Sequence, residues 1–510
     1  MKKIFSLFVI SILIVAGFSS TSFAATPKAG ATCAKPGTRA SDGKNSFSCQ
    51  KKGKSGVWVL EKKSSESNSN SGNKLGGNSG NNSGPQDGSV CDAKGAKNGR
   101  SSTGVELECQ KGTDGKYAWH PAMGGGGGGQ SAPTTVADVF GKDKCSGTST
   151  ELTAGIIDPA KVSYFVPLGL MFSSHITPID HIYAYFPSNR GQPIEKPAGT
   201  YQVTSPAAGK IISVEDFAKS NGYPYADYRI VIAHSCNLFS VFIHVGKLTG
   251  PAAQIASQVG ASGGWGGAVA VKSGEAIADD SERPGFDYSL FDGTKKLTGF
   301  ANLKSYSEAE TSKPWTADIL QYLPNNLRGA YEAKFLSTAS PIGGKIDWDK
   351  KGTAQGNWFV EKTNGFRGLG DQGAAYDNHG KIAHGYWDTH LAIAPDAVDR
   401  NTTVFSIGDW EGCPCQFISK NSSVTGTSIT SASGVVIVEL TEFSFRTPAG
   451  AEVSPSEPTK GYVLYSNGNV VGLLALQVQS DGNMKVEKLP GKTDKSQFMG
   501  FSSAAKIYTH

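Results

Sequence analysis

Four of the nine histidines of this 510-residue sequence fall within residues 168–245, a stretch that also contains Asp180, Asp227 and Cys236. Imidazole and carboxylate groups bind zinc and transfer protons near neutral pH, so this stretch predicts a site for metal binding or acid–base chemistry. The residues concerned are His175, Asp180, His181, Asp227, His234, Cys236 and His244.

The second half of the stretch contains two segments in which apolar residues occupy nearly every alternate position, 227–234 and 238–245. Polar residues 235–237 lie between them, a pattern that predicts a β-hairpin. Such a hairpin could present His234 and His244 across a groove to the segment that contains His175 and His181.

The rest of the chain indicates a mainly β protein, because short apolar runs alternate with Gly and Pro and glycine is abundant, at 64 residues. About 485 residues after a leader are too many for one core. We expect a central antiparallel β domain over residues 136–300, a connecting segment over 301–339 and a C-terminal β barrel or sandwich over 340–510. Short helices are expected at 136–140, 250–259 and 317–323, and Asn467-Gly468 predicts a hairpin over 462–477.

Residues 1–24 have the pattern of a secretory signal peptide: two lysines, an apolar run and small residues at the end. We therefore expect a secreted or cell-envelope protein. No other apolar run approaches the roughly 20 residues of a membrane span, so no transmembrane anchor is expected.

A Cys/Trp pattern occurs twice, in residues 30–60 and 88–121. A unit of about 35 residues buries too little apolar surface to be stable alone, so each copy is expected to be a small β module with one disulfide. The copies resemble short modules at the N-termini of actinobacterial secreted proteins. The expected pairs are Cys33 with Cys49 and Cys91 with Cys109.

Segments rich in Ser, Asn and Gly, 61–87 and 122–135, are expected to be flexible linkers. Residues 25–122 contain 15 Lys and Arg against 8 Asp and Glu, a net charge of +7, which makes an anionic surface polymer a candidate partner. The alternative is that this charge keeps a polar segment soluble. No phosphate-binding glycine loop or Gly-x-Ser-x-Gly elbow is present, and export argues against a nucleic-acid partner.

The order of four segments resembles the lysostaphin-type, or LytM-like, zinc metallopeptidases, which cut peptidoglycan cross-bridges. These segments are 206–212 (PAAGKII), 230–234 (IVIAH), 241–248 (VFIHVGKL) and 271–277 (VKSGEAI), and the resemblance covers residues 165–295. In that family a histidine and a carboxylate near the start of the domain bind zinc. A lone histidine follows in a Tyr-x-His-Leu strand, and a closing His-x-His supplies a zinc ligand and a catalytic histidine.

The resemblance places Asp180, with His175 or His181, at the opening zinc pair and His244 at the Tyr-x-His-Leu position. The closing strand, 285–292, reads GFDYSLFD and contains no histidine, which leaves Asp287 as the nearby residue able to coordinate. A catalytic zinc needs three protein ligands and an open position for water.

Two functions follow from this comparison. In the first, His175 or His181, Asp180 and Asp287 bind zinc, and His234 or His244 polarises the bound water for peptide hydrolysis. In the second, which the missing His-x-His favours, the groove binds cell-wall peptide or surface polymer with reduced or no hydrolysis.

Three further features are expected outside this set. Cys145 and Cys236 predict a disulfide, with two unpaired buried thiols as the alternative. His384 and His390, six residues apart, would share a strand face and with Asp388 form a second metal or sugar site. The nearby tryptophans would suit stacking on sugar rings if they are exposed; the alternative is that they fill the core. They are Trp348, Trp358, Trp387 and Trp410.

The Cys413-Pro-Cys415 spacing is close for a disulfide and leaves a soft metal site or redox pair open.

Overall fold

The structure is a computed structural model that describes residues 133–510 except 190–191, 195, 222–224, 260–262, 369–374 and 377–381. In the first 121 residues it describes only the strand backbone. The chain divides into two compact units, Met1–Pro121 and Ala122–His510, which are described separately. The expected leader and the linker 61–87 lie outside the described residues.

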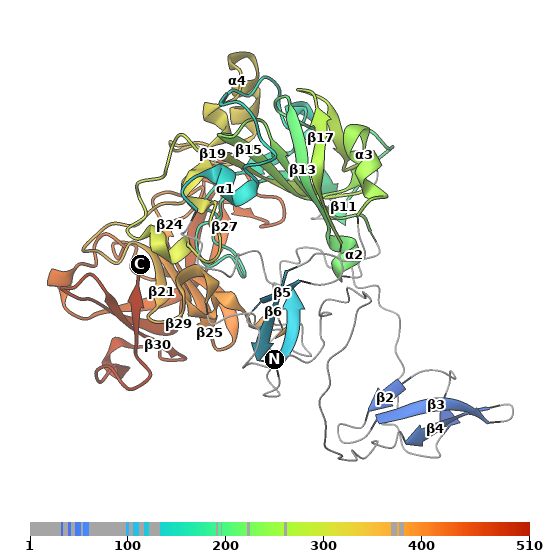
Figure 1. The fold of residues 1–510 in the computed structure, drawn as a ribbon. Coiled ribbons are helices and arrows are strands. Elements are labelled where there is room, and N and C mark those ends of the chain that lie inside the picture. Colours follow the sequence, from blue (N-terminus) through green and yellow to red (C-terminus); the bar gives the residue numbers. More distant parts are fainter. Residues whose placement is uncertain are drawn as a thin grey trace, which may run out of the picture. The chain divides into compact units, whose positions relative to one another are not determined.

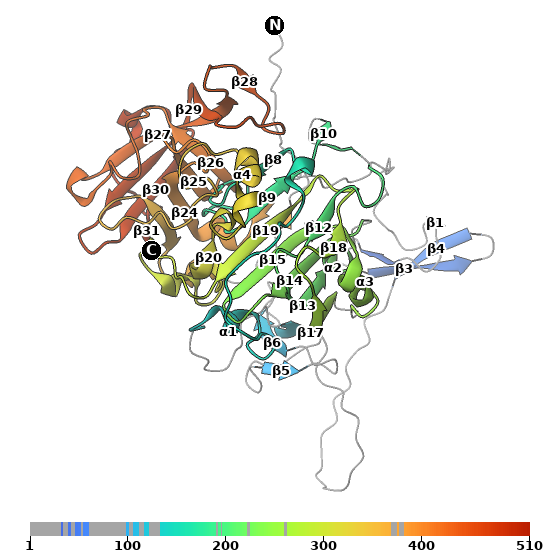
Figure 2. The same ribbon diagram turned by 90° about the horizontal axis from the view of Figure 1, so that it is seen from above.

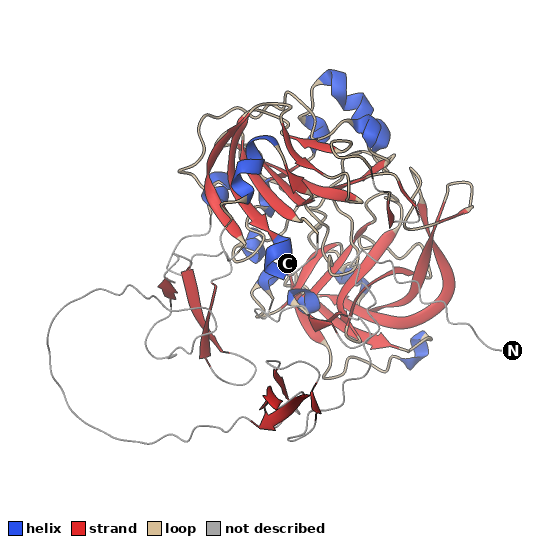
Figure 3. Cartoon of the chain, turned by 90° about the vertical axis from the view of Figure 1, so that its right-hand side faces the viewer, coloured by secondary structure: helices blue, strands red, loops and turns tan. Residues whose placement is uncertain are grey.

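The first unit contains two small antiparallel sheets (Figure 3). The strands are β1 (Thr32–Cys33), β2 (Arg39–Ser41), β3 (Ser46–Lys52), β4 (Ser55–Leu60), β5 (Asn98–Arg100), β6 (Glu106–Lys111) and β7 (Tyr117–Pro121). Cys49 lies opposite Trp58 in one sheet and Cys109 opposite Trp119 in the other, so the sequence repeat is also a repeat of strand register. The side chains of the four cysteines lie outside the described residues, and their pairing stays a prediction.

The second unit begins with an antiparallel sheet that contains the predicted hairpin (Figure 1). Its strands, in spatial order, are β17 (Gly264–Val271), β13 (Gly209–Asp216), β14 (Tyr228–Ala233), β15 (Leu238–Val245), β19 (Gly285–Asp292), β9 (Ile182–Tyr185) and β8 (Tyr164–Val166), with β20 (Thr316–Ala317) beside β19. β14 and β15 form the hairpin, which confirms that prediction.

Smaller elements surround this sheet. They are β10 (Ser188–Asn189), β11 (Gln192–Pro193), β12 (Gln202–Thr204), α2 (Phe217–Asn221), β16 (Lys247–Leu248), α3 (Gly250–Ala256) and β18 (Ala276–Asp279). β12, β18 and β16 form a separate three-stranded sheet, and α3 lies beside it (Figure 2).

The central sheet is covered on both faces, because alternate residues of a strand point to opposite sides. On β15, Leu238 and Phe242 pack into the larger core, whereas Phe239 and Val241 pack with helix α1 (Val136–Phe140) on the other face. All four side chains are buried. The nearly continuous apolar sequence of β15 reflects this two-sided burial.

Helix α1, which the sequence predicts, begins at a capping box. The Thr135 hydroxyl accepts from the Asp138 amide, and the Asp138 carboxylate accepts from the Thr135 amide. Val136 and Ala137 are buried against the sheet, so the cap fixes the helix on the core.

We expect Thr135→Ala to lower the free energy of unfolding by about 1 kcal/mol, because the helix loses its N-cap acceptor. Urea denaturation measures the change. Ser146→Ala, at an exposed serine in the following segment, should have little effect. Equal stability of the two variants would contradict the role of the cap.

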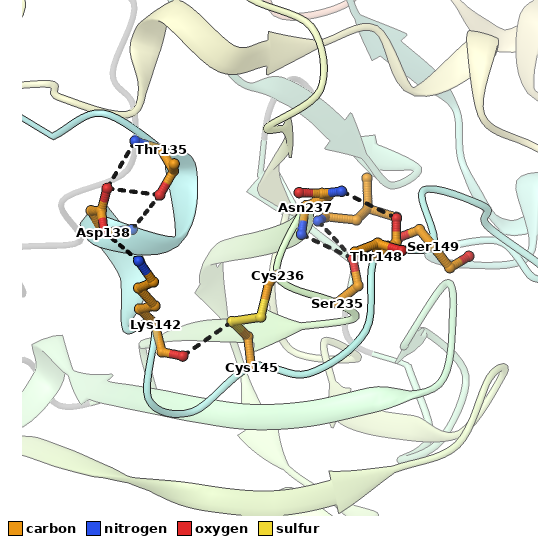
Figure 4. Close-up of a disulfide and its surroundings, with 10 residues drawn as sticks. Thr135, Asp138, Lys142, Cys145, Thr148, Ser149, Ser235, Cys236 and Asn237 are labelled. Carbon is orange, nitrogen blue, oxygen red and sulfur yellow. Dashed lines mark hydrogen bonds and ion pairs between the residues drawn. A yellow bond between two sulfur atoms is a disulfide. The ribbon is translucent and has the colours of Figure 1, made fainter.

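A disulfide joins the segment after α1 to the β14–β15 turn (Figure 4). Cys145 pairs with Cys236, as predicted. Next to it the Ser235 hydroxyl donates to the Ser149 carbonyl (2.6 Å), and the Cys236 amide donates to the Gly147 carbonyl (3.0 Å). The N-terminal approach to the sheet is thereby fixed to the hairpin.

The C-terminal sheet closes on itself, as a barrel does, because β26 also pairs with β27. Its strands, in spatial order, are β26 (Cys413–Ser419), β25 (Thr403–Trp410), β24 (His390–Pro395), β21 (Gly356–Val360), β31 (Lys506–Thr509), β30 (Met484–Pro490), β29 (Val463–Val478) and β27 (Val436–Arg446), with β28 (Glu452–Val453) outside the ring. Trp358, Trp387 and Trp410 are buried, which agrees with the alternative in which these tryptophans fill the core.

Cys413 and Cys415, in strand β26, form a disulfide.

Two expectations for this region are wrong. Residues 463–478 form the single strand β29, and both of its apolar halves pair with β27 instead of with each other. His384 ends β23 (Ile382–His384) and His390 begins β24; the short helix η6 (Tyr386–Thr389) lies between them, so they share no strand face. β23 pairs with β22 (Ala375–Tyr376) in a sheet of its own.

The central sheet and the ring share their core. One cluster of buried residues joins Val166 and Met171 of the central part to Ala392 and Val404 of the ring. Between the two sheets the chain forms η2 (Leu303–Tyr306), η3 (Lys313–Trp315), η4 (Ile319–Gln321) and α4 (Asn325–Lys334). No helix among the described residues is long and apolar enough to cross a membrane.

Candidate functional site

A cavity of about 290 Å³ lies where the central sheet, the connecting segment and the ring meet. Residues from all three parts line it. Five of the residues that the sequence assigned to the main site are among them: His175, Asp180, His181, His244 and Asp287. Side chains more than 100 positions apart in the chain therefore converge on one space.

An irregularity in the strand pairing positions the side chain of His244. In the pairing of β14 with β15 the register shifts between Tyr228 and Ile230, which is a β-bulge. His244 has a φ of 63°, in the left-handed region, and both Ile243 and His244 line the cavity. Consecutive residues of a regular strand would point to opposite faces, so the bulge turns His244 toward the cavity.

Asp287 and His181 face each other inside the cavity. Ile243 lies opposite Asp287 in the strand pairing, and His181 directly precedes β9 on the other side of β19. His181 Nδ1 is 3.6 Å from Asp287 Oδ2, beyond hydrogen-bond distance, and this buried nitrogen has no hydrogen-bond partner among the described residues.

Burial sets the charge state of this part of the cavity. It lowers the pKa of His181 to about 3 and that of His175 to about 4, so both imidazoles are neutral at neutral pH. Burial also raises the pKa of Asp287 to about 7. The cavity therefore holds a carboxyl group that is half protonated near neutrality beside a neutral acceptor nitrogen.

A carboxylate and an ammonium group carry charge within the same cavity. Burial acts to raise the pKa of Asp180, but the ammonium group of Lys313, together with a backbone hydrogen bond and smaller contributions, outweighs it and lowers that pKa, so Asp180 is ionised. Lys313 is only 2% exposed, and its Nζ lies 4.9 Å from the centre of the Phe366 ring. Among the described carboxylates none lies within 4.0 Å of this Nζ, so the ammonium group is not directly paired.

His244 lies half exposed at the cavity, and its imidazole is hydrogen-bonded to Asp227. Its Nδ1 is 3.1 Å from Asp227 Oδ1, and Arg283 Nη2 is 3.6 Å from the other oxygen of that carboxylate. Burial acts to lower the pKa of His244, but the hydrogen bond to Asp227 and the nearby carboxyl groups of Asp287 and Asp227 together outweigh it and raise the pKa. Asp227 therefore fixes the orientation of this imidazole and favours its protonated form.

His234 is placed differently from the prediction. Its Nε2 is 2.8 Å from Ser240 Oγ, which is 2.8 Å from the Tyr288 hydroxyl in the larger core. Ser240 lies on the face of β15 opposite to Val241 and Ile243, and His234 does not line the cavity. The expected placement of His234 at the groove is thus corrected: it belongs to a hydrogen-bonded chain on the other face.

The second expected site stays a prediction, because the side chain of His384 lies outside the described residues. His390 instead lines the first cavity, where its Nε2 is 3.0 Å from the Phe366 carbonyl oxygen and burial lowers its pKa to about 3. Asp388 does not line that cavity, and the side chain of His384 lies outside the described residues.

Several cavity residues were not singled out by the sequence. Lys313 and Glu310 come from the connecting segment, and Phe366 and Tyr386 come from the C-terminal part, regions that no motif linked to the histidines. Ser289 could have been found, because it follows Asp287 at the spacing of two that places strand residues on one face.

A zinc ion needs three or more donors at about 2 Å from one point. Among the described residues, no group of three or more His, Cys, Asp and Glu side chains has that arrangement. The closing strand presents Asp287 and the hydroxyl of Ser289 to the cavity. We therefore derive no reaction step through zinc, and the zinc site stays a prediction.

Comparison of the chain with models of protein families finds no match, and comparison with curated proteins finds no similar sequence. The resemblance to the LytM-like peptidases consequently depends on the segments quoted above and on the residues that meet in the cavity.

Proposed function

We propose that the protein is exported to the cell envelope and binds a peptide of the cell wall or of a surface polymer in this cavity, with reduced or no hydrolysis. The observation that carries the proposal is the convergence of His175, Asp180, His181, His244 and Asp287 on one space. These are the positions to which the resemblance assigns chemistry, in a strand set that lacks the closing His-x-His.

The chemistry of the cavity suits binding of a polar chain. Neutral imidazoles offer hydrogen-bond donors and acceptors, and Asp180 and Lys313 offer one charge of each sign. A volume of about 290 Å³ is at the lower end of the range for ligand pockets, which fits one or two residues of a peptide. The basic N-terminal segment would add attraction to an anionic polymer.

The alternative is a zinc-dependent endopeptidase with an altered metal site. The observation in its favour is that His181 Nδ1 and Asp287 Oδ2 face each other at 3.6 Å, with Asp180 and His175 in the same cavity. These four residues would hold the metal, which when bound supplies a polarised water.

Purified full-length protein titrated with soluble peptide fragments of peptidoglycan tests the proposal. We expect saturable binding in calorimetry, weakened about ten- to hundredfold by Asp180→Asn, because the variant loses a charged hydrogen-bond acceptor inside the cavity. Asp143→Asn, at an exposed carboxylate outside the cavity, is the matched control and should bind as the wild type does.

Incubation with intact peptidoglycan separates the two functions. Binding of fragments without release of new amino groups supports the proposed binder. Release of amino groups together with one zinc per chain, both lost in Asp287→Asn, would establish the alternative. Absence of fragment binding, or binding that Asp180→Asn leaves unchanged, would contradict the proposal.

A further inference from the structure

Two buried polar groups in the cavity have unused bonding capacity. The first is the ammonium group of Lys313, which is 2% exposed and has no ion pair with a described carboxylate. Its neighbour at 4.9 Å is the face of the Phe366 ring. This cation–π contact and the longer-range attraction of Asp180 and Glu310 offset part of the cost of removing the ammonium group from water, but they leave it without a direct carboxylate partner among the described residues.

The second group is Nδ1 of His181. The residue is 8% exposed, and the nitrogen has no hydrogen-bond partner among the described residues. With the ring proton on the other nitrogen, Nδ1 accepts a hydrogen bond from a group that enters the cavity. Asp287 Oδ2, at 3.6 Å, is a second acceptor beside it.

Lys313 and His181 line the same cavity of about 290 Å³ and interact electrostatically, so a ligand that satisfies both groups offers an anion and a hydrogen-bond donor within that space. The C-terminal residue of a peptide has both, because its carboxylate and its own amide N–H are separated by one carbon atom. A free anion such as acetate lacks the N–H, and the interior of a peptide chain lacks the carboxylate. The mixed polarity of the cavity therefore matches a chain end better than either of these.

We propose that the cavity binds the C-terminal residue of a peptide, with Lys313 paired to its free carboxylate and His181 or Asp287 accepting its amide N–H. The inference deepens the proposed function and rests on it, since it names the part of the wall or surface peptide that enters the cavity. Lys313 then determines specificity: it selects chain ends over cross-linked or amidated peptide.

The test compares N-acetyl-alanyl-alanine, in its L,L and D,D forms, with the corresponding C-terminal amides and with sodium acetate. Calorimetry on the full-length wild-type protein is expected to show one of the two acids binding ten- to hundredfold more tightly than its amide and than acetate. Equal binding of acid and amide would overturn the role of Lys313, and acetate binding as tightly as the acid would overturn the N–H contact.

Variants assign the preference to residues. Lys313→Met should reduce the affinity for the acid to that for the amide, whereas Lys313→Arg, which keeps the charge, should retain a preference of several-fold. Lys304→Met, at an exposed lysine of the same connecting segment, is the matched control. A Lys313→Met protein that folds and still prefers the acid would overturn the inference; if this variant does not fold, the wild-type comparison decides.

The outcome also distinguishes the inference from the proposed function. Binding of peptidoglycan fragments without discrimination between acid and amide leaves the function standing and removes the inference. Discrimination between acid and amide without binding of peptidoglycan fragments retains the chain-end specificity and removes the cell wall as its source.

Discussion

Replacing Asp287 by Asn is expected to stabilise the protein by up to about 4 kcal/mol at pH 8 and to leave its stability nearly unchanged near pH 4. Burial raises the pKa of this carboxyl group from 3.8 to about 7. The folded protein therefore keeps a proton on Asp287 over a pH range in which the unfolded chain has lost it.

The sign follows from the direction of this change. Below pH 3.8 the group is protonated in both states and costs nothing. As the pH rises toward 7, the unfolded state gains by ionising and the folded state does not, so stability falls by about 1.4 kcal/mol per pH unit. Above pH 7 the penalty is constant, and asparagine avoids it at every pH.

Urea denaturation of wild type and Asp287→Asn at pH 4.5 and pH 8 measures the effect. The charged and titratable groups near Asp287 are present in both proteins; they are His181, Tyr183, Tyr185, Asp227, His244 and Arg283. Asp143→Asn, at an exposed position, should show no such pH-dependent difference. A gap between wild type and variant that does not widen with pH would show that Asp287 titrates normally.

Removal of the Cys145–Cys236 disulfide in the double variant Cys145→Ser/Cys236→Ser is expected to lower the free energy of unfolding by about 4 kcal/mol. The bond closes a loop with a sequence separation of 91, and a cross-link over that length removes much conformational entropy from the unfolded chain. Two hydrogen bonds also join these segments in the folded state, from the Ser235 hydroxyl to the Ser149 carbonyl and from the Cys236 amide to the Gly147 carbonyl.

The ring provides a matched control. The Cys413–Cys415 disulfide spans a sequence separation of 2, for which the same chain-entropy relation gives about 1.5 kcal/mol. Denaturation midpoints of the two double-serine variants, with and without reductant, should differ accordingly. If the ring variant loses as much stability as the Cys145/Cys236 variant, loop length does not explain the effect.

Local sequence patterns predicted those parts of the fold that depend on neighbours in the chain. The β14–β15 hairpin and helix α1 formed as expected, because strand alternation and a short amphipathic turn are local properties. The Asn467-Gly468 pair did not form a hairpin. It requires positive φ, which Gly468 has at 79°, but an irregularity in the long pairing of β29 with β27 uses that conformation equally well.

The residues of the cavity were likewise predicted only in part. The sequence grouped His175, Asp180, His181, His244 and Asp287 because they lie near one another in the chain or match a family order, and they do line one space. Lys313 lies in a segment without any motif and Tyr386 in the segment assigned to the second site, and only the packing of the ring against the central sheet brings them to this cavity. His390 was assigned to a separate site because its sequence neighbours gave no indication of that packing.

The wall of the cavity is built from both β bodies and the segment between them. Exchanging the central sheet or the ring alone would therefore remove part of the cavity wall. Replacing the C-terminal part would remove Tyr386 and His390 from the cavity wall, so we expect the cavity to persist only when the central sheet and the ring are kept together.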